Sequence, residues 1–252
     1  AATGTTEEFE CTINWPHAAL TEFPGGQIYP MTQMFSLSQD NMIIVDGVMY
    51  LAMYFYGFSS YSTTREYAVS DYCKYYSTYV FSSEDNGRTW NFLSQLMPTA
   101  NYKFSEGFCE PCLNVMPDGS IMILMRSGGD GKPCYWARST NKCKTWSVIK
   151  KFDDIGVLPQ MVTLGCGVSI ATYGRPYMRI RATSDPTGKT WQPAQTFDMY
   201  SGENNSSCYY TDLLALDDTH ALWIYSDFKY PNADGVPVKS IITRVITVVF
   251  EE

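Results

Sequence analysis

The sequence has few charged residues and no long hydrophobic segment. Asp, Glu, Lys and Arg make up only 17% of its 252 residues, against about 25% in a typical soluble domain. No stretch approaches the ~20 consecutive apolar residues that a membrane-spanning helix needs, so we expect no membrane span. The formal net charge is -8. We expect no nucleic-acid partner, because nucleic-acid-binding proteins normally present a basic surface.

Paired metal-binding motifs and helical hydrophobic patterning are also missing. Cys109 and Cys112 form a single Cys-x-x-Cys motif with no second copy, so a zinc site is disfavoured. We expect no metal and no cofactor. The even total of eight cysteines is typical of a secreted protein with disulfides, and predicts an extracellular location. Cys134 and Cys143 flank one predicted strand and are a candidate pair. The chain shows no signal peptide, as in a mature chain, a fragment or an intracellular protein.

Aromatic, β-rich segments separated by turns make up most of the chain. The nineteen tyrosines and six tryptophans favour strands. Four segments each consist of an apolar run, a short turn and a second apolar run, which is the pattern of a β-hairpin. Their turns are Asp46-Gly47, Pro117-Asp118-Gly119, Gly165-Cys166-Gly167 and Asp217-Asp218. A Tyr/Ser-rich insertion, 58–79, interrupts the first unit.

A short motif recurs after three of the four hairpins. It reads SSEDNGRTW at 82–90, RSTNKCKTW at 138–146 and TSDPTGKTW at 183–191. Its short polar side chains can accept hydrogen bonds from the turn's backbone N–H groups, and Gly87 permits a positive φ. A calcium loop would need more carboxylates than Glu84 and Asp85 supply, so we interpret the motif as structural. We expect Trp90, Trp146 and Trp191 to occupy equivalent buried positions.

The motif resembles the Asp-box, the recurring hairpin of sialidases and related β-propellers. Units of about 40–50 residues with four strands are propeller blades. We therefore expect an all-β fold: one β-propeller domain over 1–252, built of four-stranded blades with Asp-box hairpins. The visible units are about 31–97, 98–152, 153–200 and 201–252, and residues 1–30 are unassigned. The family has six blades, which implies that N-terminal blades are lacking and that a separate N-terminal segment completes the propeller.

Three stretches resemble sialidase active-site segments. FCEPCLNVMPDGSIMILMR carries Glu110 and Arg126, TYGRPYMRIR carries Arg175, and SSCYYTDLLALDD carries Tyr210. The resemblance implies that Tyr210 is the nucleophile, that Glu110 takes its proton, and that Arg126 and Arg175 hold the substrate. Taken singly, each residue also fits a structural role: a solvated strand end for Glu110 and Arg126, a turn residue for Arg175, and a core or surface aromatic for Tyr210.

The chemistry explains why these residue types belong together. Sialic acid carries a carboxylate on its anomeric carbon, which repels a carboxylate nucleophile but not a neutral tyrosine. A phenol has a pKa of about 10 and needs a neighbouring base. The planar fork of arginine suits the substrate carboxylate. The predicted function is an exo-sialidase-like glycoside hydrolase acting on sialylated glycans.

Two features of the family pattern are missing from this sequence. It has no Arg-Ile-Pro motif to supply the first substrate-binding arginine. The family's acid/base aspartate has no counterpart either, since Asp40 and Asp46 look like turn residues. Either the chain is a C-terminal piece of the fold, or it is a diverged propeller that binds glycans without cleaving them. A purely structural or adhesive propeller is a third interpretation.

Overall fold

The structure is a computed structural model that describes residues 7–14, 20–22, 28–30, 36–56, 75–99, 101–129, 131–197 and 208–250. Side chains are described for these ranges except 20–22, 28–30, 36–41 and residue 56. The described residues form strands and turns and contain no helix. The prediction of an all-β fold is therefore confirmed. Most of the predicted insertion, residues 58–74, lies outside the described residues.

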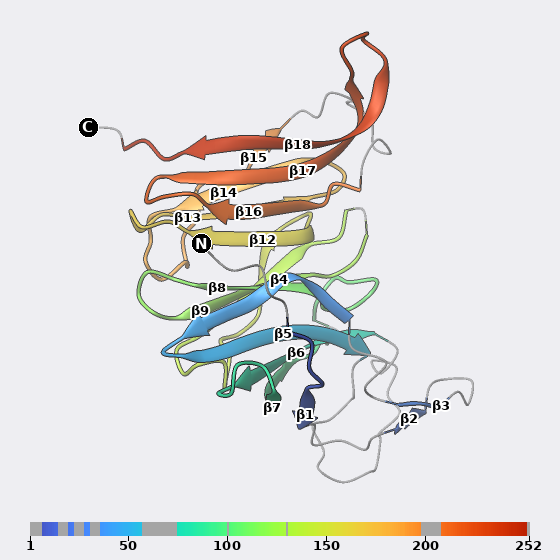
Figure 1. The fold of residues 1–252 in the computed structure, drawn as a ribbon, viewed down its shortest axis with the longest axis vertical. Coiled ribbons are helices and arrows are strands. Elements are labelled where there is room, and N and C mark those ends of the chain that lie inside the picture. Colours follow the sequence, from blue (N-terminus) through green and yellow to red (C-terminus); the bar gives the residue numbers. More distant parts are fainter. Residues whose placement is uncertain are drawn as a thin grey trace.

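Four sheets follow one another along the chain and stack along its long axis (Figure 1). The first has the order β1-β7-β6-β5-β4 and consists of β1 (Thr12–Asn14), β4 (Ser36–Val45), β5 (Val48–Tyr56), β6 (Tyr76–Ser83) and β7 (Thr89–Leu96). The second contains β8 (Cys109–Val115), β9 (Ile121–Arg126), β10 (Cys134–Ser139) and β11 (Lys150–Asp153). The third contains β12 (Val157–Thr163), β13 (Ser169–Gly174), β14 (Met178–Thr183) and β15 (Gln195–Phe197). The fourth contains β16 (Thr211–Ala215), β17 (His220–Pro231) and β18 (Pro237–Thr247).

The sheets differ in strand number from the uniform four that the sequence predicted. β1 comes from the unassigned N-terminal segment and pairs in parallel with the edge strand β7, with Thr12 opposite Thr89. β2 (Leu20–Glu22) and β3 (Ile28–Pro30) form a separate two-stranded pair. In the fourth sheet the described residues supply three strands, two of them long. The predicted propeller of six blades stays a prediction.

All four predicted hairpin turns are present. β4 and β5 meet at Asp46 and Gly47, whose φ angles of 51° and 77° are both positive, as a two-residue type I′ turn requires. β8 pairs with β9, β12 with β13, and β16 with β17, each antiparallel across the predicted turn. The local turn signals therefore located the two strands that flank each of these four turns.

The first strands of the four hairpins, β4, β8, β12 and β16, lie beside one another in that order. β8 and β12 run the same way, because Glu110 contacts the Leu158 N–H near their starts and the Thr163 hydroxyl donates to the Val115 carbonyl at their ends. Gly174 pairs with Val157 at the start of β12, and a Cβ atom at Gly174 would lie 2.3 Å from the Tyr209 carbonyl oxygen, which places the start of β16 near the start of β12. We call the end at which β8, β12 and β16 begin the site end.

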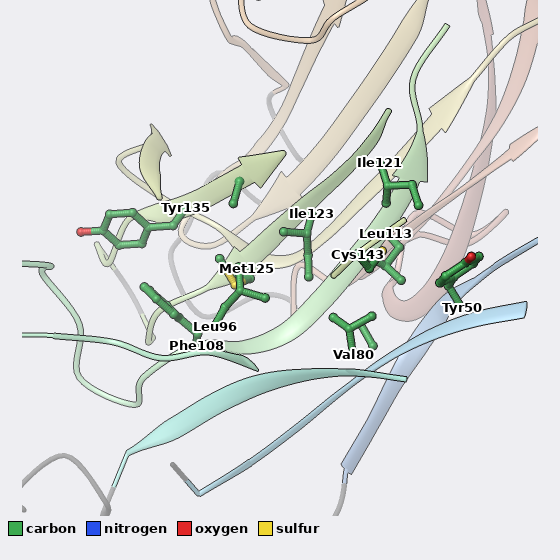
Figure 2. Packing of buried hydrophobic residues seen from close by; sticks show 12 residues of the cluster. Tyr50, Val80, Leu96, Phe108, Leu113, Ile121, Ile123, Met125, Tyr135 and Cys143 are labelled. Atoms are coloured by element: carbon green, nitrogen blue, oxygen red, sulfur yellow. The ribbon is translucent and has the colours of Figure 1, made fainter. Parts of the chain in front are cut away.

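The second sheet is buried on both faces, which explains the unbroken apolar sequence of β9. Ile121, Ile123 and Met125 face Val80 and other side chains of the first sheet (Figure 2). The alternate residues Met122 and Leu124 pack in a second cluster with side chains of the third sheet. Strands covered on both faces read as continuous hydrophobic runs. Arg126 is the last residue of β9, so this buried cation lies where the apolar strand ends, at the site end.

The first copy of the repeated motif forms a hydrogen-bonded turn between β6 and β7. The Ser83 hydroxyl accepts from the Gly87 N–H at 2.9 Å, and the Asp85 carboxylate accepts from the Thr89 N–H at 2.8 Å. Trp90 follows the turn and is 7% exposed, as predicted.

The second and third copies repeat this arrangement with substitutions. Ser139 and Asn141 make the equivalent bonds to backbone N–H groups, and Asn141 stands where the first copy has Asp85. In the third copy Asp185 accepts from the Thr190 N–H at 3.0 Å. Trp146 and Trp191 are only half-buried, so the predicted burial is correct for Trp90 and wrong for these two. Both lie at the margins of clusters between neighbouring sheets.

The Asp85 turn predicts an acid-sensitive contribution to stability. Hydrogen bonds from the Thr89 backbone N–H, the Thr89 hydroxyl and Ser83 lower the pKa of Asp85 to about 2. Because the folded pKa lies below the unfolded one, this stabilisation is present above pH ~4 and is lost as the pH falls toward 2. Asp85→Asn, which copies the natural Asn141 turn, should keep the fold. The difference in melting temperature between wild type and variant should shrink on acidification, and a difference independent of pH would contradict this assignment. Asn141→Asp is the reciprocal control.

The candidate disulfide between Cys134 and Cys143 is wrong. Both are buried free thiols, and they belong to different hydrophobic clusters. Cys134 begins β10 at the site end, whereas Cys143 lies in the turn beyond its other end. Six strand residues at about 3.3 Å each separate them by far more than the ~7 Å that a disulfide tolerates.

The two outermost sheets carry exposed apolar side chains. Leu214, Ile241 and Val245 of the fourth sheet are 58%, 72% and 58% exposed, and Ile44 of the first is 63% exposed.

In the ranges that the structure describes, no helix is long and apolar enough to cross a membrane. The same ranges contain no group of three or more His, Cys, Asp or Glu placed to hold a metal ion.

Candidate functional site

The site end is marked by a repeated strained residue. Glu110 has a φ of 42° just inside β8, Leu158 has 41° just inside β12, and Tyr209 has 57° just before β16. In β8 and β12 the strained residue coincides with a register shift against the next strand. Positive φ costs energy in a non-glycine residue and is concentrated at functional sites. In these three sheets the backbone is therefore strained at the same point, the start of the first strand.

Glu110 is held tightly within this bend. It is 9% exposed. One carboxylate oxygen lies 2.5 Å from Nη1 of Arg126, and the other accepts the Leu158 N–H at 2.9 Å. The first contact spans the β8–β9 pair, and the second joins the second sheet to the third. A buried carboxylate is stable when it is paired and hydrogen-bonded in this way.

Arg126 is shared between two carboxylates. Besides Glu110, its guanidinium lies 3.1 Å from an oxygen of Glu106, and its Nε donates to the Gly128 carbonyl at 2.9 Å. Burial by itself lowers the pKa of Arg126, but the charges of Glu110 and Glu106 outweigh burial and leave the pKa raised. Arg126 is therefore a permanent cation, and the trio of Arg126, Glu106 and Glu110 carries a net charge of -1 when both carboxylates are ionised.

Arg175 and Tyr210 occupy the neighbouring part of the site end. Arg175 follows β13, and its Nη2 donates to the Cys208 carbonyl at 2.9 Å, so its guanidinium reaches the segment that leads into β16. Tyr210 is 42% exposed, whereas Tyr209 before it is 2% exposed and packs with Trp223. The chain therefore buries one tyrosine of the pair and presents the other to solvent.

The structure brings the four predicted residues to one end of the sheets but joins them in two groups. Glu110 and Arg126 are in direct contact, and Arg175 contacts the segment that carries Tyr210. Among the residues that the structure describes, no hydrogen bond links Tyr210 to Glu110. The two oxygens of Glu110 are directed at Arg126 and Leu158.

A cavity of about 660 Å³ opens beside Glu110. It is lined by Tyr54, Tyr75, Tyr76, Ser105, Glu106, Cys109 and Glu110. Burial, together with the negative charge of Glu110, raises the pKa of the Cys109 thiol well above its ordinary value, so this thiol is neutral. Among the described residues that line the cavity, the two glutamates are the charged side chains.

Sequence reasoning missed Glu106 and the tyrosines of the cavity. The one local signal was Gly107, which directly follows Glu106 and has a φ of 98°. A Cβ atom at Gly107 would lie 2.3 Å from the Tyr76 carbonyl oxygen, so only glycine lets this loop approach β6 so closely. A glycine before a predicted site strand can indicate such a close approach, but it does not predict which side chains line the cavity.

Similar proteins are found by structure only. No description of a known protein family and no curated protein sequence matches the chain. A protein of unknown function from Dyadobacter fermentans superposes with a TM-score of 0.63 at 18% identity, covering 84% of this chain and 54% of that one. A glycoside hydrolase family 43 arabinoxylan arabinofuranohydrolase from Bacillus subtilis gives a TM-score of 0.54 at 12% identity, covering 83% and 50%. NanB sialidase from Streptococcus pneumoniae gives 0.50 at 15% identity, covering 82% and 29%.

This chain therefore spans between 29% and 54% of the length of those three proteins. At such low identity the likeness concerns the fold alone. The chain shares its all-β, propeller-like fold with these proteins.

Proposed function

We propose that this chain is a sialidase-like glycoside hydrolase whose sugar site lies at the site end. The observation that carries the proposal is the buried Glu110–Arg126 pair, built on a strained residue and braced against the next sheet through Leu158. Buried ion pairs and strained backbone are costly and are retained where a site needs fixed geometry. The likeness in fold to glycoside hydrolases supports the same class of substrate.

In the proposed reaction Tyr210 attacks the anomeric carbon of an acidic sugar. Its phenolic proton passes to Glu110 while the bond from the anomeric carbon to the glycosidic oxygen breaks, and the departing oxygen takes a proton from solvent water. The sugar is held on the tyrosine oxygen until water displaces it, and Glu110 then returns its proton to that oxygen. Arg175, which reaches the Tyr210 segment, would hold the substrate carboxylate. Arg126 would orient Glu110, and would reach the substrate carboxylate directly only if Glu106 moved aside.

Glycan binding without cleavage is the second candidate function. It is favoured by the contacts of Glu110, which are directed at Arg126 and Leu158 rather than at Tyr210. A propeller that keeps these residues to shape a binding site would need no nucleophile. The two candidates share a substrate class and differ in turnover.

Release of sialic acid from sialyllactose separates these candidates. We expect the protein to liberate free sialic acid, measured by chromatography over hours at neutral pH. Binding of sialyllactose by calorimetry with no release would instead support the glycan-binding candidate. A protein that neither binds nor cleaves sialyllactose would contradict both.

A further inference from the structure

The cavity beside Glu110 lies between the first and second sheets, apart from the Tyr210 segment of the fourth. Tyr54 comes from β5, Tyr76 begins β6, and Glu106 lies in the loop that leads into β8. Its volume of about 660 Å³ falls within the range of small-molecule sites, about 300–1,000 Å³. Ligand sites typically combine aromatic walls with a few polar groups, and this cavity has both.

Backbone hydrogen bonds fix the wall of this cavity. The Tyr76 N–H donates to the Glu106 carbonyl at 2.8 Å, and the Phe108 N–H donates to the Tyr76 carbonyl at 2.7 Å. The ring of Tyr54 meets that of Tyr76 edge-on, with centroids 5.2 Å apart. Gly107 permits this close approach. The aromatic and acidic walls are therefore held together without a ligand, as a preorganised site requires.

The charge of the cavity selects against an acidic ligand. The guanidinium of Arg126 is already paired with Glu110 and Glu106, and its side chain is only 9% exposed. The Glu106 side chain is 39% exposed, against 11% for Glu110, so Glu106 is the carboxylate that a ligand meets. An ionised carboxylate only accepts hydrogen bonds. A ligand rich in hydroxyl donors fits this wall, and an anionic one is repelled.

We propose that this cavity is a subsite for a neutral sugar. The tyrosine rings would pack against the apolar face of the sugar while Glu106 accepts hydrogen bonds from its hydroxyl groups. This inference rests on the proposed location of the sugar site but not on cleavage. If the chain is a sialidase-like hydrolase, this subsite receives the neutral sugar to which the acidic sugar is attached.

Calorimetric titration with lactose and with arabinobiose tests the subsite directly. We expect wild-type protein to bind at least one of these neutral disaccharides. Glu106→Gln should weaken that binding about tenfold, because it removes a charge-assisted acceptor. The same change brings the trio of Arg126, Glu106 and Glu110 to zero net charge, so binding of glucuronic acid should strengthen. Glu84→Gln, in the turn at the opposite end of β6, is the matched control and should change neither affinity.

A second pair of variants guards against misfolding of the Glu106 variant. Tyr75→Ala should also weaken binding of the disaccharide, whereas Tyr177→Ala, an exposed tyrosine outside the cavity lining, should not. The proposal is overturned if neither neutral disaccharide binds, or if binding is unchanged in both Glu106→Gln and Tyr75→Ala. Binding that responds to these variants in a protein that never cleaves a sialoside would keep the subsite and reject the hydrolase. Cleavage of a sialoside by a protein that binds neither neutral disaccharide would keep the hydrolase and reject the subsite.

Discussion

Replacing Arg126 with methionine should lower the free energy of unfolding by about 3–5 kcal/mol, the usual effect of removing one partner from a buried ion pair. The guanidinium is only 9% exposed and contacts Glu110, Glu106 and the Gly128 carbonyl. Methionine has a similar length but offers no donor, so the Glu110 carboxylate, 11% exposed, would be left buried beside an apolar chain. Urea unfolding followed by tryptophan fluorescence measures the loss.

The third sheet supplies the control for this prediction. Leu158 occupies the equivalent strained position with a φ of 41°, so the backbone there accepts leucine. The double variant Glu110→Leu with Arg126→Met should therefore recover most of the lost stability, because replacing both partners of a buried pair with apolar residues is often neutral or stabilising. A double variant as unstable as Arg126→Met alone would show that the pair is required for folding. A recovered fold with no sugar activity would show that the pair is kept for function.

The hairpins of the fold could be predicted, because local sequence signals determine their turns. Three of the four hairpin turns contain a glycine with a positive φ, at Gly47, Gly119 and Gly167, and the two strands that flank each of these turns follow from it. β1 could not be predicted, because three residues show no periodicity and its pairing with β7 depends on contacts 77 residues away along the chain. The burial of Trp146 and Trp191 likewise depends on how neighbouring sheets meet.

Within the candidate site, the proximity of Glu110 and Arg126 follows from local sequence for a similar reason. Glu110 and Arg126 lie on adjacent strands of one hairpin, so their spacing in the sequence carries their contact. Glu106, Tyr54 and Tyr76 come together only because one loop crosses between two sheets. Neither periodicity nor a motif encodes that crossing. The pairing of Arg126 with Glu106 was missed, since sequence alone does not show that a guanidinium is already satisfied by two carboxylates.

Replacing Tyr210 with phenylalanine should abolish turnover of sialyllactose, with a fall of about 10³-fold or more, the scale expected when a nucleophile is removed. Its effect on stability should stay within about 0.5 kcal/mol, because the side chain is 42% exposed and no described hydrogen bond involves its hydroxyl. Binding of sialic acid should persist, since Arg175 and the rest of the site are untouched. Release of sialic acid, calorimetry and thermal unfolding measure the three effects separately.

Two other tyrosines make this result specific to Tyr210. Tyr177→Phe alters a similarly exposed residue, 47% exposed, and should leave turnover unchanged. Tyr209→Phe alters the buried neighbour, which packs with Trp223, and should retain most of the turnover. If Tyr210→Phe keeps full activity, the nucleophile is assigned wrongly, whatever the protein cleaves. If it loses binding together with turnover, Tyr210 acts as a binding contact. Because Tyr210 lies beside a strained residue and outside the core, loss of turnover without loss of stability or binding has one physical explanation: its hydroxyl takes part in the reaction.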